Sequence, residues 1–150
     1  MNIFKFNIFV VLFFFIIVDN IYTFCFSEFL EFLSNDKSIF KGNGDEVNND
    51  FFLIIVLVPF FETLIFQYIV IWSLYNITEN IKTPVIISTF LFAASHFSNI
   101  YYFIATIGSG FILSILFISV YKKTNKWAVA FTLTFLLHLE HNLVSFYFDN

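Results

Sequence analysis

Four polar residues within long apolar stretches are the side chains of this sequence that could do chemistry. Glu62, His96, His138 and Asn142 lie in three separate stretches. A carboxylate beside an imidazole can take a proton from water. A second imidazole and an amide can then stabilise the oxyanion that forms when this water attacks a carbonyl. Together, these residue types suit the hydrolysis of a peptide bond.

The elements that must position these residues are membrane helices. The chain has 150 residues, of which 59% are hydrophobic and 12% charged, and a soluble domain of this size could not bury so much apolar surface. We therefore predict an all-α, polytopic transmembrane helix bundle. The sequence has no basic patch for nucleic acid, so the expected partners are membrane lipid and a membrane-associated protein or peptide.

Hydropathy divides the chain into five predicted spans. The 38 nearly continuous apolar positions of 84–121 would form a helix of about 57 Å, against a hydrocarbon core of about 30 Å, so we place a break near Ser98 and Asn99. The predicted spans cover about 6–26, 51–75, 84–97, 102–121 and 127–148.

These spans divide the chain into an N-terminal part and a membrane core. Residues 1–50 are predicted to hold the first transmembrane helix and an acidic extramembrane loop over 27–50, which could begin with a short amphipathic continuation of that helix. Residues 51–150 are predicted to form a four-helix membrane core that carries the site. An uncleaved first helix is favoured over a removed signal peptide, because a small-x-small cleavage site is missing.

The distribution of lysines predicts the orientation in a cytoplasmic membrane. Five of the seven lysines fall on one side of the predicted spans, whereas Lys37 and Lys41 fall on the other side among acidic residues. Because positive loops stay in the cytoplasm, we predict a cytoplasmic N-terminus and an external C-terminus. The cytoplasmic group consists of Lys5, Lys82, Lys122, Lys123 and Lys126.

Three ionisable side chains are predicted to lie at one level of the membrane. Their depths from the cytoplasmic helix ends are about 20, 21 and 18 Å: Glu62 lies 13 residues before Tyr75, His96 lies 14 after Lys82, and His138 lies 12 after Lys126. Asn142 shares a face with His138, His141 shares it imperfectly and Glu140 points elsewhere. We therefore expect three helices to bring these groups together.

These residues resemble the motifs of the CPBP (or Abi) family of intramembrane endopeptidases, which is related to the type II CAAX prenyl protease. That family has a proline-preceded Glu-Glu-x-x-x-Arg motif, then Phe-x-x-x-His, then His-x-x-x-Asn. The corresponding segments here are 62–67, 92–96 and 138–142. The resemblance covers about residues 55–148, and it implies that Glu62 is the general base, that His96 helps to activate water, and that His138 and Asn142 form the oxyanion site.

The sequence departs from the family motif at two positions. Thr63 stands where the second Glu is usual, and Gln67 stands near the position of the usual Arg. Neutral hydrogen-bonding groups thus replace a buried charge pair, and neither half of the pair is left alone.

Other interpretations of the same residues stay open at this point. Glu62, His96 and His138, with His141 as a spare ligand, could hold a catalytic zinc ion. A His-Glu-x-x-His motif is missing, however, and the resemblance favours a metal-free mechanism without a cofactor. Alternatively, a non-catalytic protein on this scaffold could act in helix association or in self-immunity to a toxin or bacteriocin. A proton or ion carrier is less favoured, because no repeat symmetry is visible.

Overall fold

Helices form all the regular secondary structure of the described residues. The computed structural model describes residues 7–35, 51–78 and 80–148. Helix α1 (Ile8–Ser34) comes first and is followed by η2 (Leu53–Leu57), α2 (Val58–Glu62), η3 (Thr63–Val70) and α3 (Ile71–Thr78), and then by α4 (Lys82–Ser95), α5 (Ile100–Thr124) and α6 (Trp127–Phe148). The predicted all-α membrane bundle is therefore confirmed.

The segments η2, α2, η3 and α3 follow one another without a break and form one continuous helix, here called the 53–78 rod. This rod, α1, α5 and α6 are each long and apolar enough to cross a membrane, whereas α4 has only 14 residues. The five predicted spans thus correspond to four full-length helices and one shorter apolar helix.

The first helix continues beyond its predicted membrane span. The sequence predicted a span to about residue 26, followed by a loop that could begin with a short continuation of the helix, and α1 continues to Ser34. The polar residues of this stretch do not break a helix, and Glu28 is exposed on its surface. The helix ends where Asn35 adopts a left-handed conformation, with φ of 53°. The rest of the predicted acidic loop, residues 36–50, lies outside the described residues.

The other predicted boundaries agree closely with the structure. Helix α4 begins at Lys82 and contains Pro84 in its first turn. The predicted break near Ser98 and Asn99 is confirmed, because the Asn99 side chain caps α5 by accepting a hydrogen bond from the Tyr102 backbone N–H at 2.8 Å.

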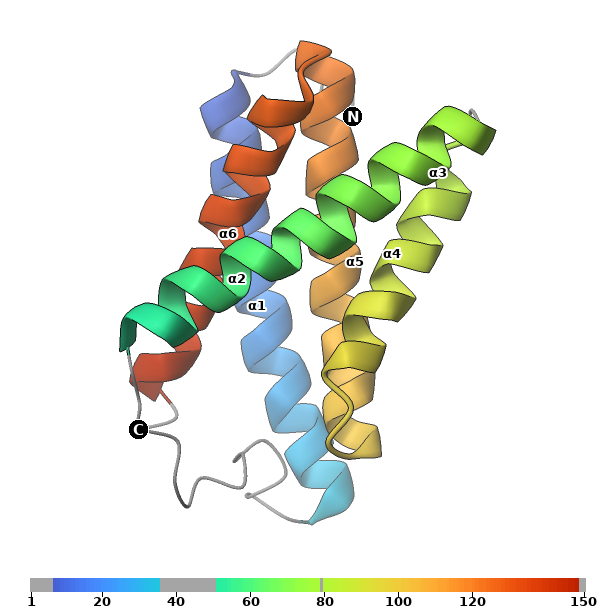
Figure 1. The fold of residues 1–150 in the computed structure, drawn as a ribbon. Helices are drawn as coiled ribbons and strands as arrows, with labels where there is room; N and C mark the ends of the chain where they lie inside the picture. The colour runs from blue at the N-terminus through green and yellow to red at the C-terminus, as the bar shows by residue number, and fades with distance from the viewer. Residues whose placement is uncertain (1–6, 36–50, 79, 149–150) are drawn as a thin grey trace.

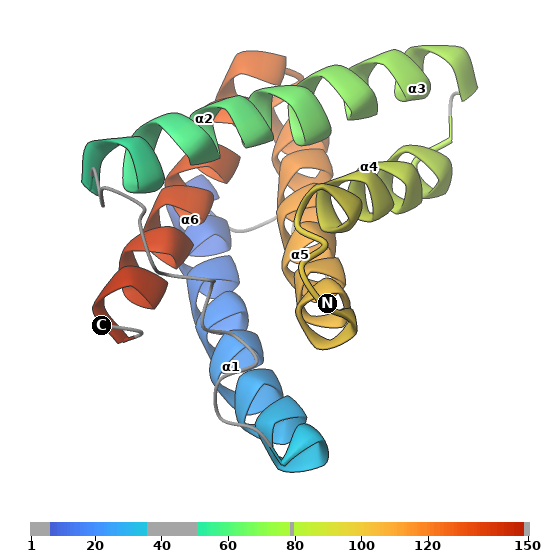
Figure 2. The same ribbon diagram turned by 60° about the horizontal axis from the view of Figure 1, so that its bottom comes forward.

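Helices α5 and α6 lie in the middle of the bundle (Figures 1 and 2). On one side they contact α1, and on the other side the 53–78 rod crosses them obliquely (Figure 2). Helix α4 folds back along α5 and also contacts the rod. The core between these helices includes Leu116, Phe117 and Leu137, which are completely buried.

Glycines of α5 permit two close contacts with neighbouring helices. A side chain at Gly108 would overlap the ring of Tyr22 on α1, and one at Gly110 would lie 2.8 Å from Phe92 on α4. Tyr22 donates a hydrogen bond to the Ala105 carbonyl at 2.9 Å. Small residues therefore set the distances from α5 to both neighbours.

Candidate active site

Glu62 lies between two histidines that come from different helices. It is the last residue of α2, at the start of the π-helical turns of η3. Its Oε1 lies 3.1 Å from Nε2 of His96, and its Oε2 lies 3.4 Å from Nε2 of His138. The structure thus brings together the three ionisable groups that the depth comparison placed at one level.

The end of α4 fixes the orientation of His96. Its Nδ1 lies 2.8 Å from the carbonyl oxygen of Phe92, one turn earlier. A carbonyl can only accept a hydrogen bond, so Nδ1 carries a proton and Nε2 is the nitrogen that faces Glu62. One proton is then shared between His96 Nε2 and Glu62 Oε1, which is the arrangement that a carboxylate base needs in order to exchange a proton.

Thr63 and Glu62 contact the two nitrogens of one imidazole. His138 is almost completely buried on α6, and its Nδ1 lies 3.1 Å from the hydroxyl oxygen of Thr63. When Glu62 is ionised it accepts from Nε2–H of His138, and Nδ1 then accepts the hydroxyl proton of Thr63. The Glu62 carboxylate therefore selects the tautomer of His138, and the Thr63 hydroxyl satisfies the other ring nitrogen.

Asn142 lies one turn after His138 on α6, where its amide satisfies a backbone group of the rod. Its Nδ2 donates to the carbonyl oxygen of Ile54 at 3.2 Å. In the π-helical segment η2 each N–H bonds the carbonyl five residues earlier, as the Val58 N–H does with the Leu53 carbonyl. By this pattern the Ile54 carbonyl would accept from the N–H of residue 59. Residue 59 is a proline without an N–H, and Asn142 supplies the missing donor. The second hydrogen of this amide remains for another acceptor.

The matched family is consistent with this geometry. Residues 48–144, which carry all four predicted site residues, match the family model described as type II CAAX prenyl endopeptidase Rce1-like. The chain belongs to this family. No curated protein and no solved structure matches the chain. The Rce1-like match indicates the fold of a CAAX-type intramembrane protease, a hydrolase, and the long apolar helices make the protein integral to a membrane.

A second polar cluster of this Rce1-like protein was not predicted from the sequence. Nδ1 of His141 lies 2.7 Å from Oδ2 of Asp19, and the Asn20 amide donates to Oε1 of Glu140 at 2.9 Å. His141 thus faces α1 and not Glu62. A signal for Asp19 was present, because a carboxylate inside an apolar run of membrane-spanning length needs a partner in the same way as Glu62.

Gln67 is the least satisfied polar residue near the Rce1-like site. Its side chain is completely buried, and neither amide atom has a hydrogen-bond partner among the described residues. It lies near the position at which the family motif has Arg, one turn along the rod from Thr63. The two departures from the motif therefore differ, since Thr63 contacts His138 and Gln67 makes no polar contact within the described part of the chain.

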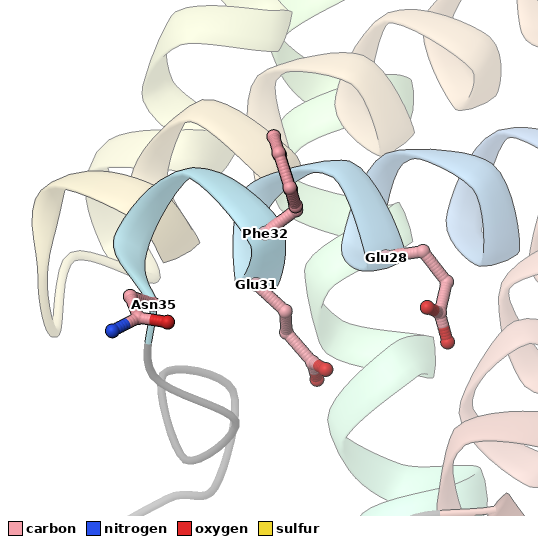
Figure 3. Close-up of a pocket in the computed structure, with 4 residues that line it drawn as sticks. All are labelled: Glu28, Glu31, Phe32 and Asn35. Atoms are coloured by element: carbon pink, nitrogen blue, oxygen red, sulfur yellow. The ribbon is translucent and has the colours of Figure 1, made fainter.

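Two further features of the Rce1-like chain concern ligands. Within residues 7–35, 51–78 and 80–148, no group of three or more His, Cys, Asp or Glu side chains is arranged to hold a metal ion. A hollow of about 390 Å³ lies at the end of α1, where it is lined by Glu28, Glu31, Phe32 and Asn35 (Figure 3). All four lining residues belong to the last turns of α1 and its C-cap, so none of the four predicted site residues lines this hollow.

Proposed function

We propose that this protein is an intramembrane endopeptidase that hydrolyses a peptide bond of a membrane-associated protein or peptide. The observation that carries the proposal is that both oxygens of Glu62 face an imidazole Nε2, at 3.1 Å from His96 and 3.4 Å from His138. Because the Glu62 side chain is 19% exposed and that of His138 is 3% exposed, water and substrate reach the site from the Glu62 and His96 side.

In the proposed reaction, Glu62 removes a proton from a water molecule that His96 helps to orient. The water oxygen attacks the peptide carbonyl carbon, and the carbonyl oxygen becomes an oxyanion. Nε2–H of His138 and the remaining amide hydrogen of Asn142 donate to this oxyanion. The proton held by Glu62 then passes to the amide nitrogen as the C–N bond breaks, which leaves a carboxyl and an amino product.

We further propose that the N-terminus is cytoplasmic and the C-terminus external. The start of α4 and the α5–α6 turn lie at the same end of the bundle (Figure 1). Lys82 is the first residue of α4, Lys122 and Lys123 lie in the last turn of α5, and Lys126 lies between α5 and α6. The clustering of lysines at one end is typical of the cytoplasmic side.

The proposal is tested with the full chain in detergent or proteoliposomes, using membrane-associated peptides with and without a prenyl group. Glu62→Gln keeps the shape of the side chain and removes the base, so we expect cleavage to fall by at least about a hundredfold. The matched control is Glu28→Gln, an exposed carboxylate remote from the site, which should cleave at the wild-type rate. A chelator arm is run in parallel.

Each result separates the alternatives. Wild-type cleavage by Glu62→Gln overturns the glutamate mechanism. Cleavage that a chelator abolishes and Zn²⁺ restores favours the zinc interpretation instead. If no peptide is cleaved while Glu62→Gln lowers stability or partner binding, the protein is a non-catalytic member of the family, as an immunity or helix-association role requires.

A further inference from the structure

Helix α6 is held between two acidic side chains that come from opposite sides of the bundle. Glu62 reaches it from the 53–78 rod, and Asp19 reaches it from α1. Figure 2 shows the rod and α1 on different sides of α6. Asp19 lies near the middle of α1 and is only 2% exposed. A carboxylate buried in this way inside a membrane-spanning helix is costly unless it is paired, so its contact with α6 holds the two helices together.

The contact between α1 and α6 consists of two adjacent polar pairs. Oδ2 of Asp19 lies 2.7 Å from Nδ1 of His141, and the next residue, Asn20, donates to Glu140 at 2.9 Å. Hydrogen bonds to an ionised group are about twice as strong as neutral ones. Two consecutive residues of α1 thus hold two consecutive residues of α6, and these lie on the turn between His138 and Asn142.

Helix α1 is itself fixed in relation to α5. The Tyr22 hydroxyl donates to the Ala105 carbonyl at 2.9 Å, and the Tyr22 ring occupies the space that Gly108 leaves free. Val11 and Phe15 on the same helix are buried in the core. The position of Asp19 is therefore also defined by the packing of α1 on α5, so Asp19 can act as a fixed point for α6.

We infer that Asp19 is a positioning residue of the site: through His141 it holds the turn of α6 that presents His138 and Asn142. The inference rests on the proposed function. His138 and His141 are three residues apart on one rigid helix, so a rotation or shift of this turn moves His138 relative to Glu62. A misplacement of about 1 Å at a reacting group can lower a rate by about a hundredfold.

The chain contains three histidines in all, which makes a direct test practical. They are His96, His138 and His141, so each ¹⁵N-histidine NMR signal of the full chain in detergent can be assigned with one His→Gln variant. The variants compared are Asp19→Asn, which keeps the shape and removes the charge, and the exchange Asp19→His with His141→Asp. Ile17→Ala, on the exposed face of α1, is the matched control.

In Asp19→Asn we expect the signals of both His141 and His138 to move, and kcat to fall roughly tenfold to a hundredfold with little change in KM. The exchange variant should restore the His138 signal and most of kcat, because the pair is present again with its partners reversed. Ile17→Ala should leave the His138 signal and kcat unchanged.

Three results decide the inference. If Asp19→Asn moves only the His141 signal and leaves kcat at the wild-type value, the pair merely stabilises the fold and the inference is wrong. If Asp19→Asn does not fold, the exchange variant takes its place: a wild-type His138 signal supports the inference, and an altered one overturns it. If the wild-type chain cleaves nothing, the proposed function fails, and the His138 signal still decides whether Asp19 positions this turn.

Discussion

The hydroxyl oxygen of Thr63 lies 3.1 Å from Nδ1 of His138, while the neighbouring residue, Glu62, faces Nε2 of the same ring at 3.4 Å. Two consecutive residues of one helix therefore bind the two nitrogens of one buried imidazole. Thr63 stands where the family motif has its second Glu, so this contact gives the departure from the motif a physical role. The hydroxyl orients His138 without bringing a second negative charge beside Glu62.

Removal of this hydroxyl should impair catalysis and leave the fold intact. Thr63→Val has almost the same shape but leaves the buried Nδ1 of His138 without a hydrogen-bond partner, so the ring loses one of the two contacts that fix its orientation toward Glu62. We expect kcat to fall about tenfold, which corresponds to about 1.4 kcal/mol of transition-state stabilisation. Thr63→Ser keeps the hydroxyl and should retain most of the activity. Wild-type kcat in Thr63→Val would show that Thr63 does not orient His138 for catalysis.

Substitution of Gln67 should stabilise the protein. Both polar atoms of this completely buried amide lack a partner among the described residues, and an unpaired buried polar group costs about 1–3 kcal/mol. Gln67→Leu is similar in volume and should raise the free energy of unfolding, measured by thermal or denaturant unfolding in detergent. Gln67→Glu keeps the shape but adds a charge, and should lower it. A less stable Gln67→Leu would mean that the amide has a partner.

Substitutions at Pro59 and Asn142 should have non-additive effects on the free energy of unfolding, because both residues determine whether the Ile54 carbonyl has a donor. Asn142→Leu leaves the Ile54 carbonyl without its donor, which should cost about 1–3 kcal/mol of unfolding free energy. In a Pro59→Ala background the new backbone N–H can bond Ile54, so the same Asn142 substitution should cost less. A double-mutant cycle measures the difference. Additive effects of the two changes would contradict this account of the Ile54 carbonyl.

The effect of Gly108→Ala on the free energy of unfolding should depend on whether the Tyr22 ring is present. Gly108→Ala places a methyl group in the Tyr22 ring and should destabilise the docking of α1. In a Tyr22→Ala background that space is open, and alanine is better than glycine in a helix by up to about 1 kcal/mol, so Gly108→Ala should then be neutral or stabilising. Unfolding free energies of the four proteins test this. A loss of equal size in both backgrounds would mean that another group limits the space at Gly108.

The sequence by itself determined the number of apolar helices, the break at Asn99 and the common depth of Glu62, His96 and His138. These features depend on hydropathy and on helical rise, which are properties of each segment alone. The lysines and the length of the 84–121 run were enough to show that three ionisable groups lie at one level. The sequence left open how far the first helix continues into the polar residues after its membrane span, and the structure shows that it ends at Ser34.

Only the tertiary structure decided which faces of these helices meet. Depth fixes the position of a residue along a helix axis, whereas contact also depends on how each helix is rotated about that axis and on where it crosses its neighbours. Rotation places Thr63 beside Nδ1 of His138 and turns His141 toward Asp19. The π-helical turns and Pro59 leave the Ile54 carbonyl to Asn142, a contact that no spacing in the sequence predicts. The sequence thus placed the reacting groups at one level, and the packing of α1 and the rod against α6 decided how they are held.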